Sequence, residues 1–191
     1  MPWEKQFDVD DALERAGEAF WERGYKATSM RDLLAAMGIQ KGSFYGTYRS
    51  KRDAYLDALR RYDMRSAGEL EQLVAGLEPL PALRAVFDMV TDDCLEGPRR
   101  GCMVVNCALE LAHEDDEARA IVDRAIERTE ALFARLIAAG QGAGDIAITL
   151  DTDATAKTMM ALLIAMRVRS RAGGSAATIR TLADQAIGLV A

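Results

Sequence analysis

The chain has 191 residues, half of them apolar, and a net charge of −6. This length allows one or two small domains with a hydrophobic core of useful size. Because the net charge is negative, the protein as a whole does not attract nucleic acid, so a DNA-binding function would need a local basic surface.

The first expected helix covers residues 9–23. Its apolar side chains share one face, formed by Val9, Leu13, Ala16 and Phe20. Gly24 follows as a helix stop, and we expect the helix to pack on the segment that comes next.

A second helix is predicted to begin at Met30, because Ser29 and Asp32 have the spacing of a capping box. Gly38 is expected to end this helix, since glycine readily adopts the left-handed backbone conformation. One apolar stripe runs along it, formed by Met30, Leu33, Leu34 and Met37.

A third, short helix is predicted from Gln40. Phe44 and Tyr48 lie four residues apart and face inward. The outward positions are Gln40, Lys41, Ser43, Tyr45 and Thr47. Two short helices joined by a glycine turn form a helix-turn-helix, whose second helix lies in the major groove of DNA.

The charge of this segment differs from that of the whole chain. Residues 23–52 hold seven Lys or Arg against a single acid, Asp32, whereas residues 53–191 hold fifteen Lys or Arg against twenty-two Asp or Glu. A basic surface on an acidic body attracts phosphates locally and discourages non-specific binding. The alternative is a solvated basic hairpin with no partner.

The same stretch carries a dense set of motif residues: Gly24, Tyr25, Thr28, Gly38, Lys41, Gly42, Ser43, Phe44, Tyr45, Tyr48, Ser50 and Lys51. Because of these residues, the stretch 8–56 resembles the DNA-binding module of the TetR (tetracycline repressor) family. The chain departs from the family pattern at Gln40, Gly46 and Arg49, which usually are a small capping residue, a bulky residue and a proline. Gly46 is expected to cost the third helix about 1 kcal/mol relative to alanine.

The resemblance and the outward positions together predict the DNA contacts. We expect Lys51 against a phosphate and Tyr45 in a second backbone contact, with Gln40, Lys41 and Thr47 near bases or adjacent phosphates. The predicted DNA-binding residues are Thr28, Ser29, Arg31, Gln40, Lys41, Gly42, Ser43, Tyr45, Thr47, Tyr48 and Lys51.

Six further helices are expected beyond residue 50, which makes about nine in an all-α protein. The first three are predicted over Lys51 to about Leu77, Pro79 to Gly97, and residues 101–112. The next begins at Asp115 or Asp116 and is broken at Gly140 to Gly144. The last two are capped by Asp151 or Asp153 and by Ser175. Residues 101–112 are apolar almost all round and should be buried on every side. We expect a DNA-binding domain at residues 1–52 and a helical ligand-binding and dimerisation domain at 53–191.

The last two helices are more apolar than a single buried face requires. The family resemblance implies that this pair forms a two-fold dimer interface, which would place Leu163 and Ile187 against a second copy. The alternative is that both helices only complete the core of the monomer.

The sequence offers no catalytic constellation, metal site or cofactor site. His113 is the only histidine, and the three cysteines form no Cys-x-x-Cys pair. Such a cysteine count fits a reducing compartment. A start without an apolar signal-peptide core, and the lack of a long uncharged apolar run, predict a cytoplasmic protein without a transmembrane helix.

Residues 99–107 are the informative part of the body. Their Gly-Cys entry into an apolar helix resembles a TetR subgroup that senses electrophiles or small organic ligands, and by position the sensing thiol would be Cys102. Buried, inert cysteine is the expectation for Cys94 and Cys107, and Asn106 is either a polar group in the pocket or a satisfied core amide. The predicted ligand-binding residues are Phe87, Arg100, Cys102, Met103, Asn106 and Phe133.

The sequence therefore favours a homodimeric, ligand-responsive transcriptional regulator, a repressor released from palindromic operator DNA by a small organic molecule or an electrophile. One alternative is a helical small-molecule-binding protein or enzyme with a non-functional DNA-binding module. Another is a helical adaptor that binds only protein.

Overall fold

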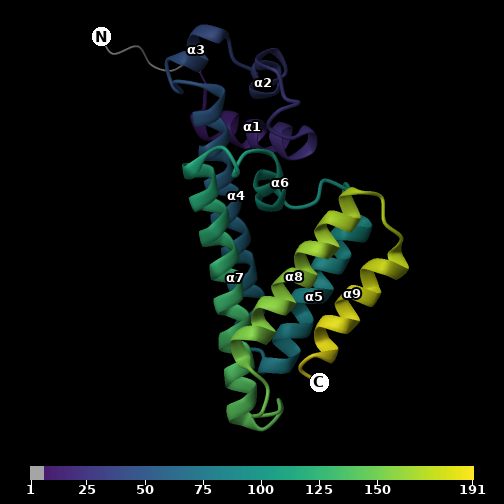
Figure 1. The fold of residues 1–191 in the computed structure, drawn as a ribbon. Coiled ribbons are helices and arrows are strands. Elements are labelled where there is room, and N and C mark those ends of the chain that lie inside the picture. Colours follow the sequence, from purple (N-terminus) through teal and green to yellow (C-terminus); the bar gives the residue numbers. More distant parts are fainter. Residues whose placement is uncertain (1–6) are drawn as a thin grey trace.

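The computed structural model describes residues 7–191, which form nine α-helices and no strand (Figure 1). This confirms the all-α class. The helices are α1 (Val9–Arg23), α2 (Met30–Met37), α3 (Lys41–Tyr45), α4 (Lys51–Val74), α5 (Pro79–Glu96), α6 (Met103–Glu110), α7 (Asp116–Ala143), α8 (Thr152–Arg171) and α9 (Ala176–Gly188).

Helix α7 continues through Gly140 and ends within the break expected at Gly140 to Gly144. It ends at Gly144, whose φ of 87° lies in the left-handed region. A Cβ on Gly140 would lie 2.6 Å from Cδ1 of Ile146, so this glycine leaves room for the following loop to fold back on the helix. Helix α4 also ends at Val74, before the expected end near Leu77.

The described residues form two hydrophobic cores, and these do not divide at residue 52. The first joins α1, α2, α3 and the N-terminal half of α4 to α6 and the start of α7. The second joins the end of α4 to α5, α8, α9 and the C-terminal half of α7. Helices α4 and α7 therefore belong to both cores, and in Figure 1 they run lengthwise beside each other.

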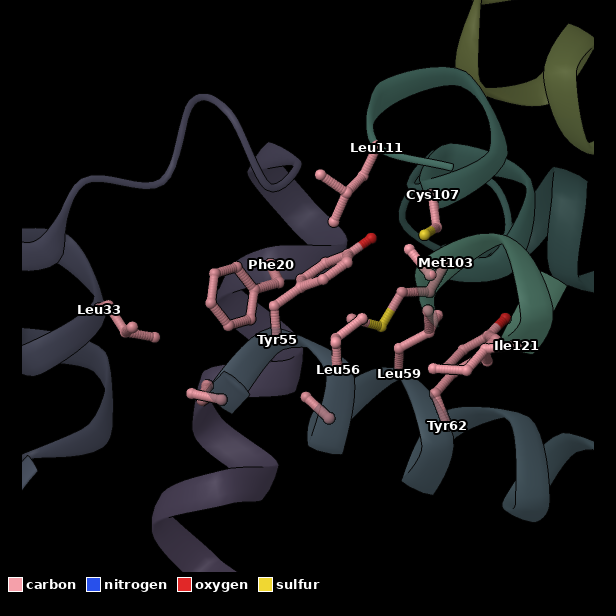
Figure 2. Packing of buried hydrophobic residues seen from close by; sticks show 14 of the residues in the cluster. Phe20, Leu33, Tyr55, Leu56, Leu59, Tyr62, Met103, Cys107, Leu111 and Ile121 are labelled. Atoms are coloured by element: carbon pink, nitrogen blue, oxygen red, sulfur yellow. The ribbon is translucent and has the colours of Figure 1, made fainter. Parts of the chain in front are cut away.

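Figure 2 shows the first core where α1, α4, α6 and α7 meet. The rings of Phe20 and Tyr55 pack edge to face, with centroids 5.1 Å apart. Met103 and Cys107 of α6 lie on this packing and are almost fully buried. The expectation that residues 101–112 are buried on every side is wrong at Leu109, which is 69% exposed because α6 has neighbours on only part of its circumference.

Ion pairs tie α4 to α7 along their length. Asp63 accepts a hydrogen bond from Arg128 at 2.8 Å, and Glu71 accepts one from Arg135 at 2.7 Å. Arg60 also pairs with Glu117 at the start of α7. These partly exposed pairs set the alignment of the two helices more than they stabilise the fold.

Candidate DNA-binding surface and effector cavity

Helices α2 and α3 form a helix-turn-helix held by a local cap and a glycine turn. The amide of Ser29 donates to Oδ2 of Asp32 at 3.2 Å, and the amide of Asp32 donates to Oγ of Ser29 at 3.1 Å, which completes the predicted capping box. The Ser29 hydroxyl also donates to Oδ2 of Asp32 at 2.6 Å, and this bond, followed by the bond from the Ser29 amide, lowers the pKa of Asp32. Gly38 has a φ of 69°, so the chain turns sharply there and enters α3.

Helix α3 presents a polar row to solvent over a single buried anchor. Phe44 is 0% exposed and packs on the first core, whereas the side chain of Tyr45 is half-exposed. The other exposed positions at this helix are Gln40, Lys41, Gly42 and Ser43. An exposed row of this kind on a second helix is the geometry that enters a major groove. The helix ends at Tyr45 with Gly46 as its C-cap, before Tyr48, which was expected on the same helix, and Thr47 is only half-buried.

Two residues predicted to contact DNA are buried and support the module instead. Thr28 is 0% exposed, and its hydroxyl donates to the carbonyl of Gly24 at 2.7 Å. Tyr48 is 5% exposed, and its ring packs on Phe44 with centroids 5.4 Å apart. In this conformation neither side chain is available to DNA, because the core of the module covers both.

Lys51 does not point freely toward solvent. Its Nζ donates to the carbonyl oxygens of Tyr25 and Thr28, at 2.7 Å in both cases, and lies 4.3 Å from the centroid of the Tyr25 ring. Desolvation lowers the pKa of this ammonium. In this conformation Lys51 therefore closes the loop between α1 and α2, and its phosphate contact stays a prediction.

The folded chain compensates several of the basic charges counted in the sequence. Lys26 pairs with Glu114 at 2.8 Å, and Arg52 pairs with Glu117 at 3.0 Å, so acids of the body reach into the basic segment. Arg23 and Arg49 pair with nearby Asp32 and Asp53. Among residues 7–191, no carboxylate lies within ion-pair distance of Arg31 or Lys41, which leaves these two exposed cations without an acidic partner.

In the body, three of the six predicted ligand-binding residues are packed core. Phe87 and Phe133 are both 0% exposed and stack with centroids 5.7 Å apart. Met103 is 1% exposed. These three side chains belong to the hydrophobic cores and do not form an open ligand surface.

The other polar candidates hold the loop between α5 and α6 against α1. Nδ2 of Asn106 donates to the carbonyl of Arg100 at 3.1 Å, which makes it a satisfied core amide on that side. The Arg100 guanidinium pairs with Glu18 and lies 4.4 Å from the centroid of the Trp21 ring. Arg171 at the end of α8 donates to the same Arg100 carbonyl at 2.6 Å.

The three cysteines differ in accessibility. Cys94 and Cys107 are buried, and burial raises the pKa of each thiol, that of Cys107 to about 11. Cys102 is partly exposed and is the N-cap residue of α6. This difference agrees with the expectation of inert thiols at Cys94 and Cys107.

A cavity of about 300 Å³ lies between α1, α4, α5, α7 and α8, and none of the six predicted ligand-binding residues lines it. Its walls include Trp21, Tyr62, Ser66, Met89, Asp93 and Arg167. Sequence reasoning missed these residues because five separate helices bring them together. One signal was present: Arg167 is the single charge in the apolar run of residues 159–168.

Residues 7–191 contain no group of three or more His, Cys, Asp or Glu side chains that could hold a metal ion. Within the same range, no helix is long and apolar enough to span a membrane.

A capped helix-turn-helix, joined through a long helix to a helical body with a cavity between its helices, defines a DNA-binding regulator with a separate effector domain. The family model for bacterial regulatory proteins of the tetR family matches residues 12–57, and the model for the tetracyclin repressor-like C-terminal domain matches residues 79–186. The chain belongs to the TetR family of transcriptional regulators, which confirms the resemblance found in the sequence.

Relatives and solved structures agree with this membership. The HTH-type transcriptional regulator YezE of Bacillus subtilis is 36% identical over 132 residues, which cover 68% of each chain. A crystal structure of a TetR regulatory protein from Rhodobacter sphaeroides has a TM-score of 0.87 at 26% identity and covers 96% of this chain and 99% of that one. A cysteine mutant of the regulator CifR, bound to 26-base-pair operator DNA, shares the fold at a TM-score of 0.85 and 24% identity, with 97% of both chains covered.

Proposed function

We propose that the chain is a homodimeric repressor that leaves a palindromic operator when a small organic ligand or an electrophile binds its body. Residues 1–52 act as the DNA-binding domain and residues 53–191 as the effector and dimerisation domain. Helix α4 contributes side chains to both hydrophobic cores. No catalytic role is assigned, and the named relatives are themselves regulators. A transcriptional regulator works in the cytoplasm, where its DNA is.

The observation that carries this proposal is the exposed row of α3 over the buried anchor Phe44. Lys41 and Tyr45 are its best candidates for DNA contact, with Gln40 and Ser43 beside them. Arg31 on α2 adds a second exposed cation for a phosphate.

The test is a gel shift with DNA flanking the gene, repeated over a range of salt concentrations. Lys41→Ala should lower operator affinity about tenfold and reduce the slope of log affinity against log salt by about one. Arg84→Ala, a matched loss of an exposed cation on α5, should change neither. Unchanged affinity and slope for Lys41→Ala would contradict the assignment of α3.

Release by an effector requires coupling between the body and the DNA-binding domains. The effector must bind the DNA-incompetent arrangement better than the competent one, and operator must weaken effector binding by the same factor. The hydrogen bonds from Trp21 to Gly101 and from Arg171 to Trp21 and Arg100 support such a coupling, because they join α1, the α5–α6 loop and the end of α8.

If the effector is an electrophile, Cys102 should react before the other two cysteines. It is partly exposed, whereas Cys94 and Cys107 are buried with raised thiol pKa values. Mass spectrometry after brief treatment with N-ethylmaleimide measures the order, and Cys102→Ser is the control that should remove the fast label. Equal operator binding before and after labelling of Cys102 would contradict an electrophile as the effector and leave only a reversibly bound ligand.

A further inference from the structure

A mostly buried cation lies in the wall of the 300 Å³ cavity. The side chain of Arg167 on α8 is only 14% exposed, and its Nη2 donates to Oδ2 of Asp93 on α5 at 2.9 Å. Asp93 is the only carboxylate within ion-pair distance of Arg167 among residues 7–191, and its side chain is 54% exposed. A mostly buried guanidinium needs an anionic partner, and a ligand carboxylate could replace this half-exposed one without leaving the guanidinium unpaired.

The other charges of the cavity lie at its exposed rim. Arg65 and Glu69 both belong to the solvent-exposed side of α4. Arg65 is engaged outward, since its Nη1 donates to Oε1 of Glu14 on α1 at 2.6 Å. Arg167 is therefore the charge that a ligand inside the cavity meets.

The remaining wall is mostly apolar. Indole, thioether and aliphatic surfaces come from Trp21, Leu70, Met89, Val90 and Leu163. The hydroxyls of Ser66 and Thr129 add two groups that can hydrogen-bond a ligand. One guanidinium in such a wall selects a single anionic group on an apolar body, and a planar carboxylate matches its paired donors.

We infer that the effector of this regulator is a small organic carboxylate, which binds Arg167 in place of Asp93 and lays its apolar part against Trp21 and Met89. This inference rests on the proposed function and names the ligand class of the same body. Trp21 belongs to α1, and its Nε1 donates to the carbonyl of Gly101 at 3.0 Å. A ligand in the cavity therefore touches a helix of the DNA-binding domain directly.

The test is isothermal titration calorimetry with benzoate and hexanoate as probes, and with benzamide and benzylamine as the neutral and cationic counterparts of benzoate. The full-length protein should bind the two carboxylates and neither counterpart. Arg167→Gln should weaken carboxylate binding at least about tenfold, and Arg167→Lys less, because lysine keeps the charge but not the paired donors. Arg169→Gln, an exposed cation two positions further along α8, is the matched control and should leave binding unchanged.

Asp93→Asn gives a result in the opposite direction. Since Asp93 competes with the ligand for Arg167, its neutralisation should tighten carboxylate binding about threefold or more. This variant also carries the test if Arg167→Gln does not fold, which a thermal melt monitored by circular dichroism would show. A cation site built on Asp93 would instead lose its ligand in the same variant.

Several outcomes would overturn the inference: benzamide binding as tightly as benzoate, benzylamine binding that Asp93→Asn abolishes, or wild-type protein that binds neither carboxylate. Operator binding measured by gel shift separates this failure from failure of the proposed function. Intact operator binding without any carboxylate response removes only the ligand class, whereas loss of operator binding by the wild-type protein removes the regulator itself.

Discussion

The ammonium of Lys51 lies between the carbonyl oxygens of Tyr25 and Thr28 and over the ring of Tyr25. These carbonyls belong to the loop between α1 and α2. A charged donor in a partly buried site contributes more than a neutral hydrogen bond does. The residue therefore stabilises the position of α2 and, through it, the orientation of α3.

Lys51→Met should lower the free energy of unfolding by about 1 to 3 kcal/mol, because both carbonyls lose a charged donor. Urea unfolding followed by circular dichroism measures this change. Lys41→Met, which removes an exposed cation without a carboxylate partner, should change stability by less than about 0.5 kcal/mol. Unchanged stability of Lys51→Met together with weaker operator binding would instead restore the phosphate contact.

At the scale of elements, one ion pair joins the first turn of α4 to the cap of α7. Arg52 Nη2 donates to Oδ1 of Asp115 at 2.7 Å, and its Nε donates to Oδ2 of the same residue. Asp115 also caps α7, accepting from the amides of Glu117 at 3.1 Å and Ala118 at 3.0 Å. The hydrogen bonds from Arg52 are the main reason that the pKa of Asp115 falls to about 2.

Asp115→Asn should separate the ion pair from the cap, since asparagine caps helices as well as aspartate does. The folded pKa lies below the ordinary value of 3.8, so the pair stabilises the folded state above about pH 4 and loses its contribution as the pH falls toward 2. Because Arg52 is 37% exposed, solvent screening limits the effect at pH 7 to about 1 kcal/mol.

Urea unfolding of wild type and Asp115→Asn at pH 7 and pH 3 checks this expectation, and the difference between them should shrink at the lower pH. Asp123→Asn, an exposed carboxylate further along α7, is the control and should show no difference at either pH. A difference between wild type and Asp115→Asn that does not change with pH would assign the effect to capping alone.

For the whole molecule, the question is which face of the C-terminal helices meets a second copy. Leu163 and Ile187, expected at the dimer interface, are 8% and 5% exposed within one protomer and belong to its core. Val168 on α8 and Leu189 beyond α9 are instead 40% and 38% exposed. We therefore expect these exposed apolar side chains to lie in the dimer interface formed by the two C-terminal helices.

Val168→Asp should convert the dimer to a folded monomer and weaken operator binding by at least about tenfold, because two half-sites are no longer bound together. Sedimentation velocity at micromolar concentration measures the change in mass. Met64→Asp is the matched control, since Met64 is 72% exposed on α4, and should remain a dimer. A dimeric Val168→Asp would move the interface to another face, while Leu163→Asp is expected to unfold the protomer.

The sequence by itself determined the local structure of this protein. The capping box of Ser29 and Asp32, the turn at Gly38 and the inward Phe44 all depend on residues within a few positions of one another, so spacing alone predicts them. The DNA-binding module was predictable for the same reason, together with the resemblance of its motif. The predicted starts of α7, α8 and α9 are confirmed because their Asp or Ser caps act over a single turn.

Only the tertiary structure decided which side chains are available. It placed Glu114 and Glu117 against the basic segment, turned Lys51 toward two carbonyls and assigned Phe87 and Phe133 to the core. It also brought Trp21, Asp93 and Arg167 together around one cavity. Burial and pairing depend on contacts between residues far apart in the chain, and these contacts leave no periodic pattern in the sequence.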